Sequence, residues 1–311
     1  MKTINHKTII WLASLLLCLG LMQESSFAQK DKKADKKEVV KDADKKVVKH
    51  KPVKNTFESI WIIDNQTVMV PVKKTFEMDI MHRFGVVTNG YQDFFGFFAP
   101  SNIRLGLNYV PVKNLLVGLS LTKTNMTLEG YGKYAILKQT KGIMPVSVTY
   151  FADMAVDTRN EENASFVNST DRLMYFNQLL IARKITDDFS AQVGLSVSHV
   201  NIVNGYFYEP GKFKGAMHND HFAISFSGRY KLKAAMAIIA NYDQPITKHD
   251  ANNPAPNLSF GLELTTSAHA FQFFLGNYSY ITPSRNNLFN KNDPSEKQFL
   301  IGFNITRLWN Y

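Results

Sequence analysis

The sequence predicts an all-β protein: a closed, antiparallel, up-and-down transmembrane β-barrel of about twelve strands. From Thr75 onward, runs of about ten residues alternate between apolar and polar side chains, as expected of a strand with two different faces. The connections are alternately long and short, which is typical of antiparallel strands that cross a bilayer with turns on one side and loops on the other. Prolines lie outside the interiors of these runs. Because hydrocarbon offers no partner for the amides of an edge strand, such a sheet has to close.

The strands differ in how clearly the alternation defines their two faces. In the last one, Phe303 and Ile305 share the apolar face with the terminal aromatic residue Tyr311, while Asn304 and Thr306 lie on the other. The run 131–139 has no cleanly apolar face, and the facing of 172–183 is ambiguous. The predicted strands are 75–86, 102–110, 114–122, 131–139, 146–155, 172–183, 189–201, 221–230, 233–243, 257–266, 269–280 and 297–311.

The amino end is typical of a secretory leader. Lys2 and Lys7 precede an apolar run, and a small-x-small site ending at Ala28 follows it, so we expect residues 1–28 to be a signal peptide. Cys18 is the only cysteine of the chain and lies inside this leader. The mature protein is therefore expected to be exported and to need no disulfide.

Residues 29–54 form a lysine-rich segment with eleven lysines and five acidic residues. It has no aromatic residue and few apolar ones, so we interpret it as a disordered tether in the periplasm, either a spacer or a contact for an acidic envelope partner. Of the formal charge of +10, the tether carries +6 and the leader +1, which leaves +3 for residues 55–311. That balance favours no nucleic-acid partner.

Residues 55–73 separate this tether from the predicted barrel, residues 74–311. They include Ile60, Trp61, Ile62 and Ile63, which are too apolar to remain in water. We expect the segment to pack at or in the periplasmic mouth of the barrel or to add a strand. A phenylalanine-rich loop within 88–101 is expected to fold over the other mouth or to lie in the membrane interface.

The alternation places charged side chains of both signs on the inward face of the barrel. In one hypothesis they line a narrow channel and select a small polar solute; in the alternative they pair and fill a structural or partner-binding barrel. These lumen-lining candidates are Glu77, Asp79, Arg83, Arg104, Asp153, Arg229 and Glu263. The predicted location is the outer membrane of a Gram-negative bacterium, in contact with its lipid, with the tether in the periplasm.

The sequence offers little for an enzyme or a cofactor. His199, His218 and His221 are expected near the outer rim, where imidazoles could bind a metal or sense pH, but their spacing matches no metal motif. A lipid hydrolase is the weakest alternative, because Ser198 points away from the face that His199 occupies and no Gly-x-Ser-x-Gly turn occurs. We therefore predict no catalytic residue, no metal, no cofactor and no enzymatic activity.

Several stretches together resemble an uncharacterised outer-membrane β-barrel family known from Bacteroidetes, the domain of unknown function 5777. The similarity covers about residues 56–311, and the family implies an outer-membrane-type barrel without an established activity. In this chain, Ser267-Ala268 stands where related chains often have a glycine pair. The stretches are Gln66-Thr67-Val68, His82-Arg83-Phe84-Gly85, Pro145-Val146-Ser147-Val148, residues 179–184, His269-Ala270-Phe271-Gln272, and Gly302-Phe303-Asn304-Ile305 with Arg307.

Overall fold

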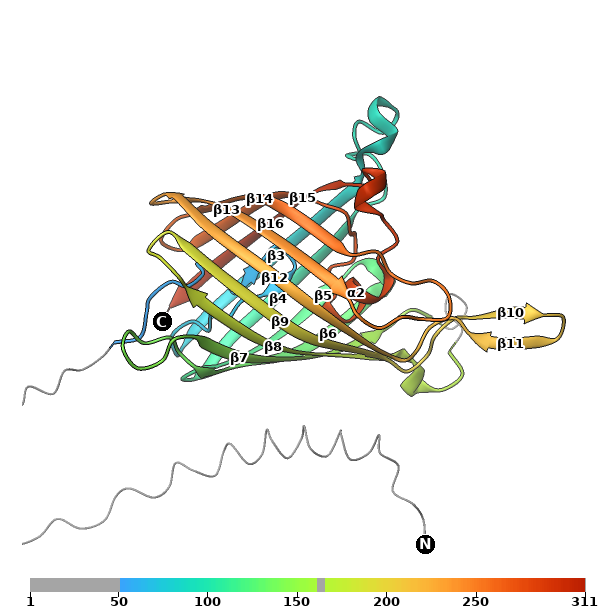
Figure 1. The fold of residues 1–311 in the computed structure, drawn as a ribbon, viewed down its shortest axis with the longest axis horizontal. Helices are drawn as coiled ribbons and strands as arrows, with labels where there is room; N and C mark the ends of the chain where they lie inside the picture. Colours follow the sequence, from blue (N-terminus) through green and yellow to red (C-terminus); the bar gives the residue numbers. More distant parts are fainter. Residues whose placement is uncertain (1–50, 161–165, 311) are drawn as a thin grey trace, which may run out of the picture. The chain divides into compact units, whose positions relative to one another are not determined.

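The computed structural model of the protein describes residues 51–160 and 166–310 (Figure 1). The predicted signal peptide, 1–28, and residues 29–50 of the predicted tether lie outside these residues. The described part of the chain belongs to one compact unit that begins at Lys49.

Twelve antiparallel strands close into a single barrel, which confirms the predicted fold class. Each barrel strand pairs with the barrel strands that precede and follow it along the chain, and β16 pairs with β3 to complete the ring. The strands are β3 (Thr75–Val86), β4 (Asn102–Val112), β5 (Leu115–Thr122), β6 (Thr127–Leu137), β7 (Ser147–Asp157), β8 (Leu173–Lys184), β9 (Phe189–Val200), β12 (Asp220–Lys233), β13 (Met236–Pro245), β14 (Asn257–Thr265), β15 (His269–Gly276) and β16 (Leu300–Asn310).

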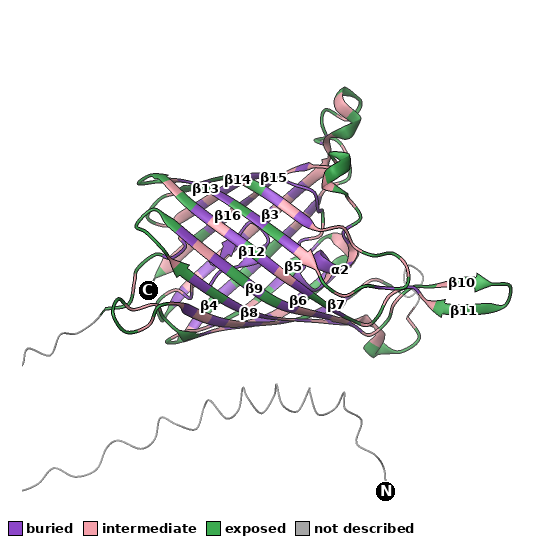
Figure 2. Ribbon diagram, viewed as in Figure 1, coloured by how far each residue is buried: buried purple, intermediate pink, exposed green. Residues whose placement is uncertain are grey.

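Buried and exposed residues alternate along the strands of the barrel wall (Figure 2), and the two faces have the opposite polarity to those of a water-soluble protein. On β16, Asn304 and Thr306 point inward and are buried, whereas Ile301 and Phe303 on the outer face remain partly exposed. On β5, Leu119 and Leu121 keep 63% and 60% of their surface exposed. An apolar outer band around a polar interior is what a strand-built membrane protein needs.

The connections divide the barrel into two different ends. Short turns, such as residues 234–235 between β12 and β13, lie at one end, which we call the turn end. Long connections lie at the other, the loop end (Figure 1). They contain the hairpin strands β10 (Gly205–Glu209) and β11 (Lys212–Gly215), the 3-10 helices η1 (Val87–Gln92), η2 (Thr124–Met126), η4 (Ser169–Arg172) and η5 (Pro294–Glu296), and the α-helix α2 (Pro283–Phe289).

The loop-end mouth is covered by α2 and not by the phenylalanine-rich loop. The loop that carries η1 stands away from the barrel, where Phe98 keeps 83% of its surface exposed (Figure 1). In contrast, Leu288 of α2 is fully buried and packs against Met174 and Val200 at the ends of β8 and β9. Among residues 51–160 and 166–310, no helix has the length and hydropathy needed to cross a membrane.

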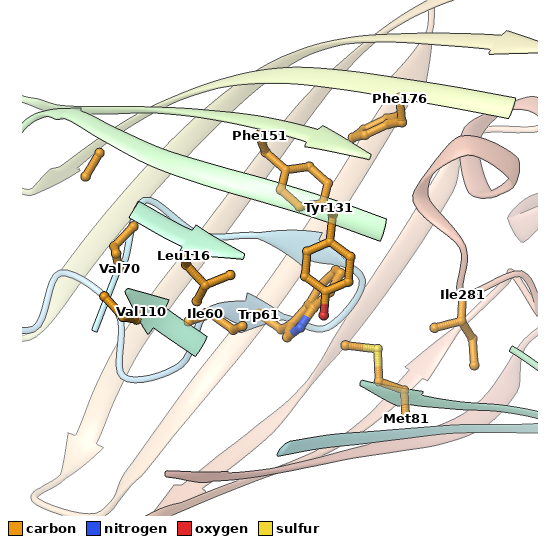
Figure 3. Packing of buried hydrophobic residues seen from close by; sticks show 11 residues of the cluster. Ile60, Trp61, Val70, Met81, Val110, Leu116, Tyr131, Phe151, Phe176 and Ile281 are labelled. Carbon is orange, nitrogen blue, oxygen red and sulfur yellow. The ribbon is translucent and has the colours of Figure 1, made fainter. Parts of the chain in front are cut away.

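The interior of the barrel holds residues 57–70, which we call the plug. Within it, β1 (Trp61–Ile62) and β2 (Asn65–Gln66) form a two-stranded sheet of their own. Trp61 packs among inward-facing side chains of the wall, including Leu116, Tyr131 and Phe151 (Figure 3). The plug enters from the turn end, since the chain just before it is bonded through Val53 N–H to the carbonyl of Gln139, at 2.7 Å.

Candidate functional site

Glutamine side chains of the wall hold the backbone of the plug. Gln272 on β15 donates from Nε2 to the carbonyl of Trp61 at 2.9 Å and accepts at Oε1 from the N–H of Ile63 at 3.0 Å. On the other side of the barrel, Gln192 on β9 donates to the carbonyl of Gln66 at 2.8 Å. Each amide offers the plug a donor and an acceptor, as a neighbouring strand would.

Lys133 on β6 is buried and adds a cation to this set. Its Nζ donates to Oε1 of Gln66 at 2.8 Å, to the carbonyl of Thr67 at 3.2 Å and to that of Ile60 at 3.4 Å. A buried ammonium has to find such oxygens because it has lost its water. Lys133 therefore stabilises the folded hairpin of the plug as well as its place in the lumen.

The tip of the plug is bound to the structure that covers the loop end. Asp64, between β1 and β2, accepts hydrogen bonds from Asn241 Nδ2 at 3.0 Å and from the hydroxyl of Tyr278 at 2.5 Å. Asn286 of α2 donates to the other carboxylate oxygen. The carboxyl group of Asp64, with three donors, thus links plug, wall and α2.

All seven predicted lumen residues are buried on the inner side of the wall. Arg104 brings two carboxylates together: its Nη1 lies 2.6 Å from Oδ1 of Asp79 and its Nε lies 2.8 Å from Oε2 of Glu129. The guanidinium also lies 4.8 Å from the ring centre of Trp61 in the plug. This group therefore joins three strands of the wall to the plug.

The remaining cations of the predicted set are separate from that group. Arg229 pairs with Glu263 at 2.7 Å, and Arg83 donates to Asn304 Oδ1 at 2.9 Å while its guanidinium lies 4.5 Å from the ring centre of Phe274. Both cations thus have an oxygen partner on the wall.

Two predicted carboxyl groups have open hydrogen-bonding capacity within the described part of the chain. Glu77 Oε1 and both carboxyl oxygens of Asp153 are buried without a hydrogen-bond partner there. The sequence analysis did not identify Glu129, since it began that strand at Tyr131, and it did not identify Lys133, since neither face of the predicted run is cleanly apolar. In the structure the strand begins at Thr127, and its alternating burial places both residues on the inner side.

Cavities lie at both ends of the barrel. A cavity of about 350 Å³, the loop-end cavity, lies beside α2 and is lined by Arg159, Arg172 and Arg285. A larger one of about 730 Å³ lies at the turn end beside Val53. A small cavity next to Asp64 in the plug has a volume of about 10 Å³, space for about one water at most.

The histidines form one close pair that the sequence analysis did not predict. His249, in the loop after β13, lies with Nε2 2.9 Å from Nδ1 of His221, and its Nδ1 accepts the backbone N–H of His218 at 3.0 Å. His199 instead lies 2.6 Å from Asp220. Within residues 51–160 and 166–310, no group of three or more metal-binding side chains is arranged to hold an ion.

A closed twelve-stranded barrel with an apolar outer band and a polar interior defines a membrane β-barrel protein. Residues 57–309 match the family described as "Membrane bound beta barrel domain (DUF5777)", and the chain belongs to this family. The match includes the plug as well as the wall.

Solved structures with a similar fold include three outer-membrane proteins. The NanC porin is 10% identical, with 76% of this chain and 99% of that chain covered and a TM-score of 0.45. An outer-membrane channel from Pseudomonas putida F1 is 12% identical, with 78% and 97% covered and a TM-score of 0.47. The KdgM porin is 11% identical, with 76% and 99% covered and a TM-score of 0.41. No curated protein matches the chain.

Proposed function

We propose that the protein is an outer-membrane channel for a small polar solute, that the plug closes it in this structure, and that movement of the plug opens it. In this proposal the loop end faces the outside, and the turn end and the lysine-rich tether face the periplasm. The tether is continuous with the plug, so a pull on the tether would act directly on the closing element.

The observation that carries the proposal is how the plug is held. It forms its own small sheet, and its backbone is bound to the wall through side chains such as Gln192, Gln272 and Asn304. Side-chain hydrogen bonds each contribute about 0.5–1.5 kcal/mol and can be exchanged for water. The wall closes through β16 and β3 without the plug, so the plug can leave while the barrel stays closed.

The wall behind the plug suits water. Ser120, Thr122 and Ser196 face inward and are buried along with the charged residues. Glu77 Oε1 and both carboxyl oxygens of Asp153, which have no hydrogen-bond partner among the described residues, would gain hydrogen bonds if water entered. A lumen that remained permanently dry would have no use for these groups. In the open state we expect the seven lumen-lining charges to face the path and select the solute.

The second candidate is a filled structural or partner-binding barrel. Arg104 favours it, because this residue is fully buried and paired with both Asp79 and Glu129. Opposite charges that neutralise each other stabilise a filled interior and leave little field to select an ion. The gated channel and the filled barrel differ in whether the protein ever conducts ions across a bilayer.

A reversible disulfide between plug and wall tests the proposal. Ser59 in the plug and Thr306 on β16 lie with their hydroxyl oxygens 3.4 Å apart, and both are buried. The double variant Ser59→Cys/Thr306→Cys should form a bond that fixes the plug, with no competing cysteine once the leader with Cys18 is removed. In planar bilayers we expect no current when oxidised and channel openings after reduction.

The two single-cysteine variants are the matched controls, and both should conduct in either redox state. No current from the reduced double variant and from the unmodified protein at any voltage would support the filled barrel. Equal current with the disulfide formed and with it reduced would show that the conducting path does not pass the plug. The proposal that the plug gates the channel would then be wrong.

A further inference from the structure

The loop-end cavity combines several cations with an apolar wall. We propose that it is a binding site for a small organic carboxylate. Arg159 and Arg172 come from the connection between β7 and β8, and Arg285 comes from α2. The fold therefore brings two different loops together around one space of about 350 Å³.

The acidic residues of the cavity do not use up its cations. Asp157 accepts both Nε and Nη2 of Arg159, at 2.9 and 2.8 Å, and also Nη2 of Arg285 at 3.2 Å. One carboxylate is thus shared between two guanidinium groups. The Nε of Arg285 is buried without a hydrogen-bond partner among the described residues. A carboxylate in the cavity would supply the missing acceptor.

The third arginine is bound by carbonyl groups in place of a carboxylate. Arg172 Nη1 donates to the carbonyls of Asp157 and Arg159 at 3.1 and 2.5 Å, and its guanidinium lies 4.6 Å from the ring centre of Phe166. The second acidic residue of the lining, Asp171, already accepts the backbone N–H of Asn168 at 2.8 Å. Among the described residues of the lining, three cations accompany two carboxylates, an excess of +1.

The excess positive charge of the cavity lining matters because Arg285 is largely removed from water. Burial lowers the pKa of Arg285, and the charge of Asp157 only partly opposes this effect. An arginine keeps its charge in proteins, so a lowered pKa indicates an incompletely compensated cation. A bound anion would offset this deficit.

The rest of the lining indicates the kind of anion. Met174, Val200, Val203 and Phe289 add apolar surface to the lining of the cavity. The volume lies at the lower end of the range for small-molecule sites, roughly 300–1,000 Å³. A single carboxylate on a hydrocarbon or ring-shaped body fits both the charge excess and this apolar surface better than a doubly charged phosphate.

The cavity lies beside α2, which is bound to the tip of the plug through Asn286 and Asp64. If the proposed channel function is correct, and on that condition alone, the carboxylate is also the solute that the channel receives from outside. Binding itself does not require an open path.

Binding can be measured by isothermal titration calorimetry on the full mature chain in detergent. The probes are benzoate, its neutral counterpart benzamide, and phenyl phosphate. We expect benzoate to bind at least about ten times more tightly than benzamide, and the benzoate affinity to fall as salt is raised. Arg285→Gln should weaken benzoate binding about ten-fold, and Arg285→Lys should restore part of it because it keeps the charge.

Arg307→Gln is the matched control, since it removes an exposed arginine from the turn end and should leave the benzoate affinity unchanged. Heat-modifiable electrophoretic mobility shows whether each variant keeps its folded barrel. Equal affinity for benzoate and benzamide, tighter binding of phenyl phosphate than of benzoate, or an Arg285→Gln variant that is folded and binds benzoate normally would overturn the inference. Benzoate binding without any current from the reduced Ser59→Cys/Thr306→Cys protein would overturn the channel and keep this site.

Discussion

The Nζ atom of Lys133 on β6 lies 2.8 Å from Oε1 of Gln66 in the plug, and the same ammonium contacts two carbonyl oxygens of the plug. One side chain of the wall therefore satisfies three acceptors of the plug. Its position allows the closed state to be weakened without a change in the plug itself.

Lys133→Met is expected to open the channel more often. Loss of the ammonium leaves three buried plug oxygens without their donor in the closed state, whereas water can bind them in the open state. A charged hydrogen bond contributes about 1.5–3 kcal/mol, so the open probability should rise at least about ten-fold. Single-channel recording in planar bilayers measures this directly.

Lys113→Met is the control, because Lys113 is exposed in a turn and does not touch the plug. It should leave the open probability at the unmodified value. An unchanged open probability in Lys133→Met would show that this ammonium does not contribute to closure.

Arg104→Met is expected to destabilise the whole barrel. The change leaves Asp79 and Glu129 buried beside each other without their shared cation. Removing one partner of a buried ion pair costs about 3–5 kcal/mol. Urea unfolding of the protein in lipid vesicles, followed by tryptophan fluorescence, should show a clearly lower midpoint.

The triple variant Arg104→Met/Asp79→Asn/Glu129→Gln separates charge from packing. It removes the uncompensated carboxylates and should recover much of the lost stability. Arg307→Met, at an exposed position, should have an unchanged midpoint. A triple variant as unstable as the single one would show that the guanidinium acts through its contact with Trp61.

The bounds and facing of the strands were predictable where polar groups line the lumen. They were less predictable where inward apolar side chains pack against the plug. The bounds of β3 were predicted correctly, because Glu77, Asp79 and Arg83 alternate with apolar residues. The alternation fails at Tyr131 and Phe176, which point inward yet are apolar because they pack around the plug. Because a segment of the same chain occupies the interior, the alternation of polar and apolar residues no longer shows which face of these strands points inward.

The sequence predicted which charged residues face the lumen, but it did not predict which of these charges pair with each other. The seven lumen residues are all inside, since strand period alone decides facing. Which charges meet depends on contacts across several strands, such as that between Arg104 and Glu129, and on where the plug lies. The cover by α2 had no periodic signal, because a helix of seven residues in a long loop has less than two full turns of pattern.

Acid is expected to release the loop that carries His249. Burial lowers the pKa of His249, and the neighbouring His218 lowers it further, while Asp250 opposes them. Asp250 is itself paired with Lys214 at 2.9 Å. The neutral ring accepts the N–H of His218 at Nδ1, and His221 lies against Nε2, so a second ring proton removes this acceptor.

The sign follows from the lowered pKa. Folding favours the neutral ring, so this contribution to loop stability is fully present above the ordinary histidine pKa of about 6.5 and is lost as pH falls below it. Hydrogen exchange at the His218 amide, corrected for the intrinsic rate, should be faster at pH 5 than at pH 7.5. In His249→Gln the pH dependence should disappear; equal protection at both pH values in the unmodified protein would contradict the prediction.

Two glycines of the barrel wall, on β14 and β12, should respond in opposite ways to alanine. A Cβ on Gly261 of β14 would lie 2.1 Å from the carbonyl oxygen of Phe273 and 2.5 Å from Cβ of Phe274, both on β15. The added methyl group has to displace backbone, so Gly261→Ala should cost about 1–3 kcal/mol and weaken the pairing of β14 with β15.

Gly228 on β12 is the matched control, because a Cβ there meets no atom within 4 Å. Gly228→Ala should be neutral or stabilise the protein by about 0.4–1 kcal/mol, since alanine restricts the unfolded chain more than glycine does. Urea midpoints in lipid vesicles compare the two variants. If both had the same midpoint, the close approach of β14 and β15 would not constrain the barrel, whereas a loss confined to Gly261→Ala would place the constraint at that strand pair.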